Sequence, residues 1–261
     1  MADSVIIERS KDKDIATVIL NAPERLNAMG KETWAALGAA MKGLSEDETL
    51  RCVVLRGAGD KAFAAGADIK EFETERADSK QAKIYGETVA AAMMAVAECR
   101  HPTLAMIKGA CVGGGLEVAA CCDLRICGAS GRFGIPVNRL GLVMAHAELR
   151  MLMALIGRAR ALEILLEGRV FGADKALEMG LVNRVVPDGD VETEAYATAA
   201  RIAAGAPLVN RWHKKFALRL LDPAPLTDAE REEGYACFDT EDYRIGRDAF
   251  LAKQKPRFEG R

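Results

Sequence analysis

Two glycine-rich segments hold the residues best suited to chemistry. They read FAAGADIKEF at residues 63–72 and KGACVGGGLE at residues 108–117, and each lies at the end of an expected strand. Glycine lets backbone N–H groups come close to a ligand, and a helix beginning after the second segment would add the positive end of its dipole. Two N–H groups aimed at one oxygen form an oxyanion hole, which stabilises negative charge on a carbonyl oxygen.

The sequence argues against several other kinds of site. The spacing around residues 109–115 does not match the GxGxxG dinucleotide motif, and neither the P-loop motif nor the GxSxG of serine hydrolases occurs. Seven cysteines stand mostly in apolar runs without a CxxC pair, and the three histidines are scattered. We therefore predict buried, reduced thiols and no metal site.

The elements that position these segments alternate between strand and helix. Expected strands cover Ile15–Leu20, 52–56, 103–109 and 123–127, and expected helices cover 31–43, 78–100 and a segment starting at Leu116. This order predicts an α/β fold of βαβ units with right-handed crossovers. Past Gly141 the spacing is mostly helical, with MLMALIG and ARALEILLEG as separate helices and LVNRVV as a strand. We divide the chain into a core at 1–195 and a helical region at 196–261.

Composition narrows the classes of partner. The 261 residues carry a net charge of −2, and aromatic residues make up 5% of them, so no basic or base-stacking surface for nucleic acid is expected. No apolar run is long enough to span a membrane, and the N-terminal residues lack the features of a signal peptide. The sequence predicts a cytoplasmic protein with neither a nucleic-acid nor a membrane partner.

Taken together, the two segments resemble those of the crotonase, or enoyl-CoA hydratase/isomerase, family. The matching stretches are AFAAGADIKEF, GACVGGGLEVAACCDLRI, NAPERLNAM, ASGRFGIPVNRLGLV, MGLVNRVVP and EDYRIGRDAFLAKQKPRF, which together extend over nearly the whole chain. The resemblance implies a crotonase (ClpP-like) spiral of βαβ units with a C-terminal helical trimerisation region. It also implies a homotrimer or homohexamer that acts on acyl-CoA thioesters, with coenzyme A as part of the substrate and no separate cofactor.

The resemblance also implies roles for single residues. The backbone N–H groups of Ala67 and Gly114 would form the oxyanion hole, and Glu117 would transfer protons. Coenzyme A would contact Arg25, Leu26, Ala65, Asp68, Ile69 and Lys70. Phe250 and Lys253 would reach the acyl group and coenzyme A bound to a neighbouring subunit.

The sequence departs from the family pattern at one catalytic position. Hydratases of the family carry a second glutamate after the proline of FGIP, and here that position is Val137, which cannot transfer a proton. His146 is a candidate to replace the missing acid or base, or else a surface or capping residue, and Glu148 is expected to support the start of a helix. The charged residues 71–83 are interpreted as a solvated helix face, although the resemblance implies that this segment can also form a mobile wall of the acyl pocket.

Three functions stay open on these residues. The first is an enoyl-CoA hydratase-like lyase or isomerase of the kind used in fatty acid metabolism. The second is a crotonase-fold isomerase, decarboxylase or thioester hydrolase that uses Glu117 as its one catalytic glutamate or uses His146. The third is a CoA-ester-binding protein with little turnover.

Overall fold

A twisted, mostly parallel sheet forms the centre of the chain, as the alternation of strands and helices predicts. The computed structural model describes residues 3–12 and 14–261. The sheet has the order β1-β2-β3-β5-β7-β10, and every neighbouring pair is parallel except β1 with β2. Its strands are β1 (Val5–Arg9), β2 (Ile15–Leu20), β3 (Cys52–Gly57), β5 (Thr103–Ile107), β7 (Leu124–Gly128) and β10 (Arg184–Val186).

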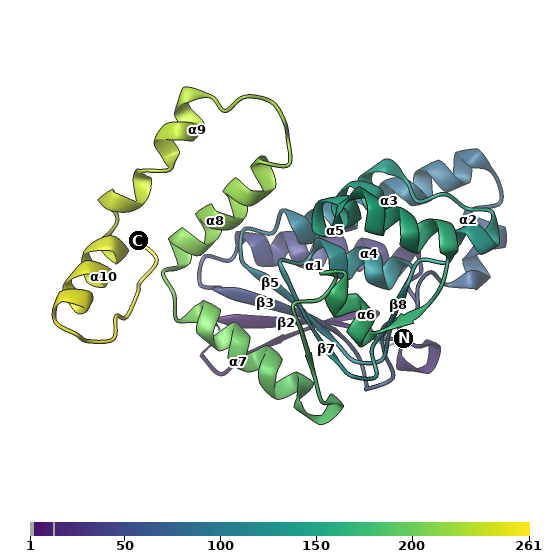
Figure 1. Ribbon diagram of the computed structural model, residues 1–261, viewed down its shortest axis with the longest axis horizontal. Coiled ribbons are helices and arrows are strands. Elements are labelled where there is room, and N and C mark those ends of the chain that lie inside the picture. Colours follow the sequence, from purple (N-terminus) through teal and green to yellow (C-terminus); the bar gives the residue numbers. More distant parts are fainter. Residues whose placement is uncertain (1–2, 13) are drawn as a thin grey trace.

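Helices cover both faces of this sheet (Figure 1). On one face lies α7 (Val191–Ala203), and on the other lie α1 (Lys31–Glu46), α3 (Ser79–Ala97) and α4 (Gly114–Cys121). Along β3 the side chains alternate, since Cys52 and Val54 join the cluster under α7 while Val53 and Leu55 join the larger cluster under α1 and α3. Burial on both faces explains why the strands read as continuous apolar runs.

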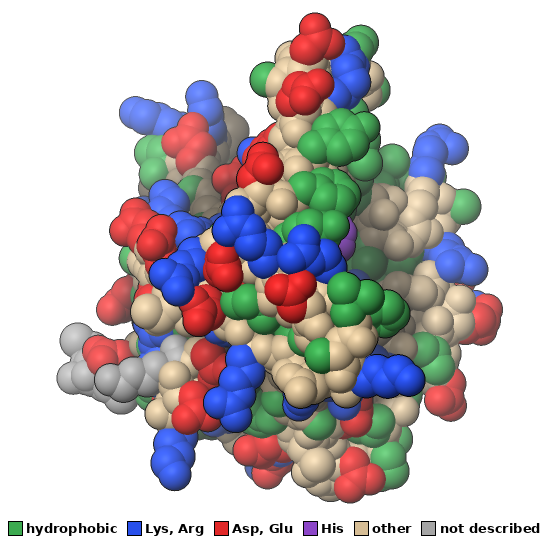
Figure 2. All heavy atoms as spheres, turned by 90° about the vertical axis from the view of Figure 1, so that its left-hand side faces the viewer, with side chains coloured by type: hydrophobic (Ala, Val, Ile, Leu, Met, Phe, Trp, Pro, Cys, Tyr) green, Lys and Arg blue, Asp and Glu red, His purple; other side chains and the backbone are tan. Residues whose placement is uncertain are grey.

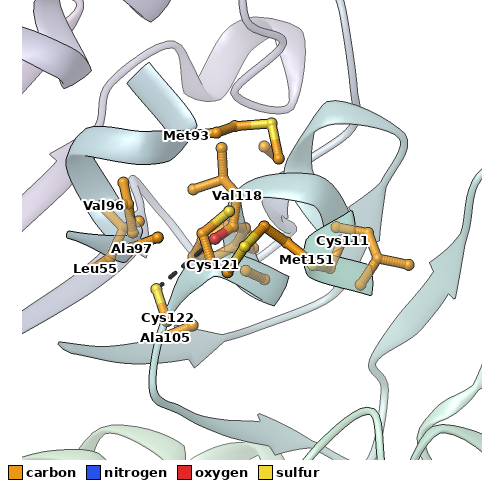
Figure 3. Packing of buried hydrophobic residues seen from close by; sticks show 14 of the residues in the cluster. Leu55, Met93, Val96, Ala97, Ala105, Cys111, Val118, Cys121, Cys122 and Met151 are labelled. Atoms are coloured by element: carbon orange, nitrogen blue, oxygen red, sulfur yellow. Dashed lines mark hydrogen bonds between the residues drawn. The ribbon is translucent and has the colours of Figure 1, made fainter. Parts of the chain in front are cut away.

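Sulfur-containing side chains fill part of the larger core. Figure 3 shows Met93, Cys121 and Met151 packed together around α4, with the Cys122 thiol donating a 3.8 Å hydrogen bond to the carbonyl of Val118. All seven cysteines are free and six of them are buried. These thiols occupy positions of small hydrophobic residues, as their apolar sequence context predicts.

A second, smaller sheet carries the glycine-rich segments. Its order is β4-β6-β8-β9, with β4, β6 and β8 parallel and β9 antiparallel. The strands are β4 (Ala62–Ala64), β6 (Ala110–Val112), β8 (Arg132–Gly134) and β9 (Phe171–Gly172). Strands of two or three residues are too short to show an alternating pattern, so the sequence did not predict this sheet.

Several helix boundaries differ from the predicted ones. α1 continues past Gly43 to Glu46, and α4 begins at Gly114 rather than at Leu116. The two helices predicted after residue 150 are confirmed as the two parts of α5 (His146–Glu167), which the non-helical backbone of Gly157, with φ of 77° and ψ of 164°, separates, although the first part begins earlier, at His146. Glycine weakens a helix without forbidding it, so the positions of the glycines alone misplace the end of α1 and the start of α4.

The segment predicted as one charged helix from residue 78 is preceded by separate short turns. These are η2 (Ile69–Glu71) and α2 (Phe72–Glu75), after which Asp78 caps α3 by accepting a hydrogen bond from the Gln81 N–H. The remaining short elements are η1 (Pro23–Arg25), η3 (Val137–Leu140), α6 (Ala173–Glu178), η4 (Asp188–Asp190) and η5 (Ala236–Asp239).

The C-terminal helices α8 (Pro207–Arg219), α9 (Asp228–Glu233) and α10 (Glu241–Leu251) extend to one side of the sheet (Figure 1). α8 is tied to the core because the buried Lys214 ammonium pairs with Asp123 at 2.8 Å. The expected division between residues 195 and 196 falls inside α7, which packs on β3, β5 and β7. Within residues 3–12 and 14–261, every helix is too short or too polar for a membrane span.

Candidate active site

The two glycine-rich segments meet because their strands are parallel neighbours. β4 and β6 pair in parallel, with Ala62 opposite Ala110. The two segments that follow these strands therefore leave the small sheet at the same edge. A methyl group built on Gly113 would lie 3.5 Å from the Cα of Gly66, and one built on Gly66 would lie 3.9 Å from the backbone nitrogen of Gly114. The turns that follow the two strands are therefore in contact.

Each turn presents a backbone N–H with no protein acceptor. The N–H of Met29 donates to the Gly66 carbonyl at 2.8 Å, and the N–H of Asp68 donates to the Met29 carbonyl at 3.1 Å. This parallel pairing turns the N–H of Ala67, the residue between them, away from Met29. Gly114 is the first residue of α4, where the helix supplies no acceptor for its N–H. Within the described chain neither N–H donates a hydrogen bond.

Gly113 makes the turn from β6 into α4. Its φ is 53°, a left-handed conformation that a residue with a side chain rarely adopts, and its N–H donates to the carbonyl of Gly134 in the β8 strand at 2.8 Å. The abrupt turn starts the helix at Gly114 and directs the free N–H groups of the first helical turn to the edge of the sheet.

Glu117 lies close to Gly114. It occupies the first turn of α4 and is only 9% exposed, and a methyl group built on Gly114 would lie 3.9 Å from its Oε2. The pKa of Glu117 is raised to about 8, mainly by burial and also by the negative charge of Glu148, while the positive charge of Arg76 acts in the opposite direction. At neutral pH most of this carboxyl group is protonated, and it titrates within the range useful for proton transfer.

Glu148 and Arg76 are the neighbours of Glu117 that sequence reasoning missed. Glu148 caps α5 as expected, with its Oε2 accepting from the Ala145 N–H at 2.7 Å, and its charge also reaches Glu117. His146 is exposed at the first residue of α5 and makes no hydrogen bond to Glu117. The interpretation of residues 71–83 as a solvated helix face does not hold for Arg76, which is half-buried.

The position of the missing glutamate is at the same edge of the small sheet. β8 pairs with β6, and Val137 begins the 3₁₀ helix η3 soon after β8 ends. Its side chain is half-buried and packs against the main core. The next residue, Asn138, is engaged in the fold, because its amide donates to the Leu166 carbonyl at 2.9 Å.

The loop expected to hold coenzyme A packs against the first glycine-rich segment. Arg25 forms an ion pair with Asp68, and the Ala65 N–H donates to the Leu26 carbonyl at 3.0 Å. Ile69 and Lys70 follow in η2 and are exposed. The structure therefore brings together the residues of this chain that the resemblance assigns to coenzyme A before residue 71.

Buried Asn27 holds the loop in place. Its side-chain amide donates to the carbonyls of Ala58 at 3.0 Å and Ala62 at 2.8 Å, while its oxygen accepts from the Ala22 N–H. Sequence reasoning did not single it out, although asparagine is among the few residues that tolerate its left-handed φ of 56°.

Within one chain, Phe250 and Lys253 do not lie near the other predicted site residues. Phe250 is 82% exposed on α10, and Lys253 follows that helix in the C-terminal region, away from α4 and the small sheet (Figure 1). Their expected contact with the site of a neighbouring subunit stays a prediction.

Comparison with known proteins supports the resemblance to the enoyl-CoA hydratase/isomerase family. The profile of the enoyl-CoA hydratase/isomerase family matches residues 10–261. A probable enoyl-CoA hydratase of Mycobacterium tuberculosis is 34% identical, with 98% of each chain covered. A crotonyl-CoA hydratase of Syntrophomonas wolfei is 30% identical, also with 98% of each chain covered.

Solved structures agree in fold. The structure of an enoyl-CoA hydratase/carnithine racemase from Magnetospirillum magneticum superposes with a TM-score of 0.97 at 50% identity, covering 100% of this chain and 97% of that one. The match extends from the parallel sheet through the C-terminal helices. The predicted resemblance and fold are therefore confirmed, and the chain belongs to the enoyl-CoA hydratase/isomerase family.

Proposed function

We propose that this enzyme transforms enoyl-CoA thioesters by holding the thioester carbonyl between the N–H groups of Ala67 and Gly114, with Glu117 moving the proton. The observation that carries the proposal is the juxtaposition of two unpartnered N–H groups with a buried carboxyl group. Full-length relatives named as enoyl-CoA and crotonyl-CoA hydratases support the same class of substrate.

The chemistry follows from the polarised carbonyl. Two N–H donors stabilise the oxyanion of an enolate, so the carbon next to the thioester becomes acidic. The charged form of Glu117 can accept a proton from water or from an acyl carbon, and its protonated form can return that proton to carbon. With a pKa of about 8, both forms are accessible near neutral pH.

Val137 favours a reaction that needs one carboxyl group. Moving a double bond requires one proton to leave one carbon and return to another, which Glu117 can do alone. Adding water requires activation of the water while a proton reaches the α-carbon, a task that two carboxylates share in the family's hydratases. Isomerisation of 3-enoyl-CoA to 2-enoyl-CoA is therefore the second candidate activity.

Crotonyl-CoA and a 3-enoyl-CoA test these alternatives directly. We expect hydration of crotonyl-CoA, followed as loss of the conjugated thioester absorbance, to be slower by about 100-fold or more than in a two-glutamate relative, because one acid–base group is missing. Isomerisation of the 3-enoyl-CoA would appear as a gain of that absorbance. Thermal stabilisation by CoA esters without turnover of either compound, or of any other CoA ester tested, would favour a CoA-ester-binding role.

Replacing Gly114 tests its N–H. The Gly114→Pro variant removes the donor at the first helical position, where proline is tolerated. We expect its kcat to fall by about 100-fold or more relative to Gly114→Ala. Alanine is the matched control because any Cβ here would lie 2.9 Å from the buried ring of Trp34, so both variants carry this steric cost. Equal rates for two folded variants would remove Gly114 from the oxyanion hole.

The pH dependence tests Glu117. If the carboxylate accepts a proton in the first step, kcat/KM should rise with pH to a plateau with a midpoint near 8, and Glu117→Gln should abolish turnover. A rate independent of pH between 6 and 9 would contradict this.

The thermal stability of the protein provides a second test of the raised pKa of Glu117. Because the folded chain raises the pKa of Glu117 from 4.5 to about 8, folding favours its protonated form. Its contribution to stability is therefore present below pH 4.5 and is lost as pH rises through 8. The Tm of Glu117→Gln relative to wild type should accordingly be higher at pH 9 than at pH 5.

We further propose that the chain assembles as a homotrimer or homohexamer through its C-terminal helices. Large apolar side chains are exposed there, at Leu220, Leu221, Tyr235, Phe238, Tyr243, Phe250 and Leu251. Figure 2 views this side of the molecule, where hydrophobic side chains line the projecting arm beside a hollow. In the proposed assembly Phe250 and Lys253 reach the site of a neighbouring copy.

Light scattering at micromolar concentration should give three or six times the 28.1 kDa chain mass. Removal of exposed apolar surface from water supplies the driving force. A monomer under these conditions would contradict both the assembly and the proposed contact by Lys253.

A further inference from the structure

Arg76 carries a positive charge that no carboxylate of the described chain neutralises. It lies between α2 and α3, half-buried, and forms no ion pair with any residue in 3–12 or 14–261. The nearby acids are engaged elsewhere, since Glu75 pairs with the Lys31 ammonium at 2.7 Å and Glu71 accepts from the Lys31 N–H at 2.8 Å. The guanidinium is therefore available to an anion from outside the chain.

Two aromatic rings hold this guanidinium in place. Its central carbon lies 3.6 Å from the centre of the Tyr85 ring and 5.1 Å from the centre of the Phe72 ring. Tyr85 is 2% exposed and is anchored by a 3.4 Å hydrogen bond from its hydroxyl to the Met29 carbonyl. A guanidinium stacked on aromatic faces keeps the N–H donors at its edge, and it is positioned before a ligand arrives.

Arg76 belongs to the reacting end of the site. Met29, which anchors Tyr85, pairs through its backbone with the residues on either side of Ala67. The positive charge of Arg76 also lowers the pKa of Glu117 against the effect of burial, so it acts on the carboxyl group beside Gly114. Arg25, by contrast, is already paired with Asp68 in the loop expected to hold coenzyme A.

The space next to Phe72, one of the two rings that hold the Arg76 guanidinium, is suited to an acyl chain. Between η2–α2 and the end of η3 lies a hollow of about 580 Å³, whose apolar lining is Ile69, Phe72, Leu140 and Leu142 and whose charged lining is Lys70 and Glu73. A chain with an apolar middle and an anionic end would contact these side chains and place its charge within reach of Arg76. A carboxylate matches the fork of a guanidinium and can accept two hydrogen bonds from it.

We propose that the acyl group carried by the substrate ends in a carboxylate, which Arg76 binds while the thioester lies at Ala67 and Gly114. This inference rests on the proposed function for the position of the thioester. It adds a specificity residue for a dicarboxylic acid bound to coenzyme A through one of its two carboxyl groups.

Equilibrium binding tests the inference without requiring turnover. Glutaryl-CoA and butyryl-CoA are saturated and differ by one terminal carboxylate, so calorimetric titration of each gives the contribution of that group. We expect wild type to bind glutaryl-CoA about tenfold to a hundredfold more tightly, the usual worth of charge-assisted hydrogen bonds. Arg76→Met should remove this preference and leave the Kd of butyryl-CoA within about threefold.

Two further variants separate charge from geometry. Arg76→Lys keeps the charge without the bidentate fork and should retain only part of the preference. Lys80→Met removes an exposed cation at the start of α3 and should change neither Kd. Equal affinities of wild type for the two esters, or an equal loss of both in Arg76→Met, would overturn the proposal and assign Arg76 to coenzyme A or to the fold.

Turnover separates this inference from the proposed function. Crotonyl-CoA and glutaconyl-CoA are the unsaturated counterparts. Arg76→Met removes a charge that lowers the pKa of Glu117, so it should shift the pH dependence of kcat/KM for both esters, but it should reduce kcat/KM for glutaconyl-CoA by a further tenfold or more relative to crotonyl-CoA, about the worth of the lost contact. If wild type prefers glutaryl-CoA but converts neither unsaturated ester, the carboxylate site stands and the proposed function is wrong. If it converts crotonyl-CoA but shows no preference for glutaryl-CoA, the proposed function stands and this inference is wrong.

Discussion

The parallel pairing of β4 with β6 is the constraint on which the rest of the site depends. Both strands end at one edge of the small sheet, so two turns that are far apart in sequence come into contact at Gly66 and Gly113. Backbone donors placed in this way need no side chain and lose no rotamer freedom when a ligand binds. Asn27 reinforces the arrangement by holding the carbonyl at the start of β4.

The charged form of Glu117 lowers the stability of the folded chain. A buried carboxyl group without an ion-pair partner destabilises its charged form, and the negative charge of Glu148 adds to that effect. Above its pKa the folded chain therefore carries an electrostatic cost. The same cost shifts the titration of Glu117 toward neutral pH, where one group can both accept and return a proton. Stability and reactivity are opposed at this residue.

The surroundings of Glu117 distinguish this chain from a two-carboxylate hydratase. Val137 packs against the core at the edge where a second acid would stand, and Asn138 is committed to the carbonyl of Leu166. The charges that reach Glu117 come instead from α5 and from the turn before α3, through Glu148 and Arg76. In the proposed mechanism one residue transfers the proton while these two adjust its electrostatic environment, and in the proposed substrate complex the cation also binds the anionic end of the acyl group.

The sequence by itself determined the glycine turns, the central strands such as β3 and the family, because each rests on local patterns or on nearly full-length motifs. It did not determine the small sheet, whose strands are too short for periodicity, or the start of α4 at Gly114. Only the tertiary structure shows that the charges of Arg76 and Glu148 shift the pKa of Glu117. It alone also shows that His146 is exposed. Electrostatic fields and burial depend on distances between segments remote in sequence, and residue types in one dimension do not contain those distances.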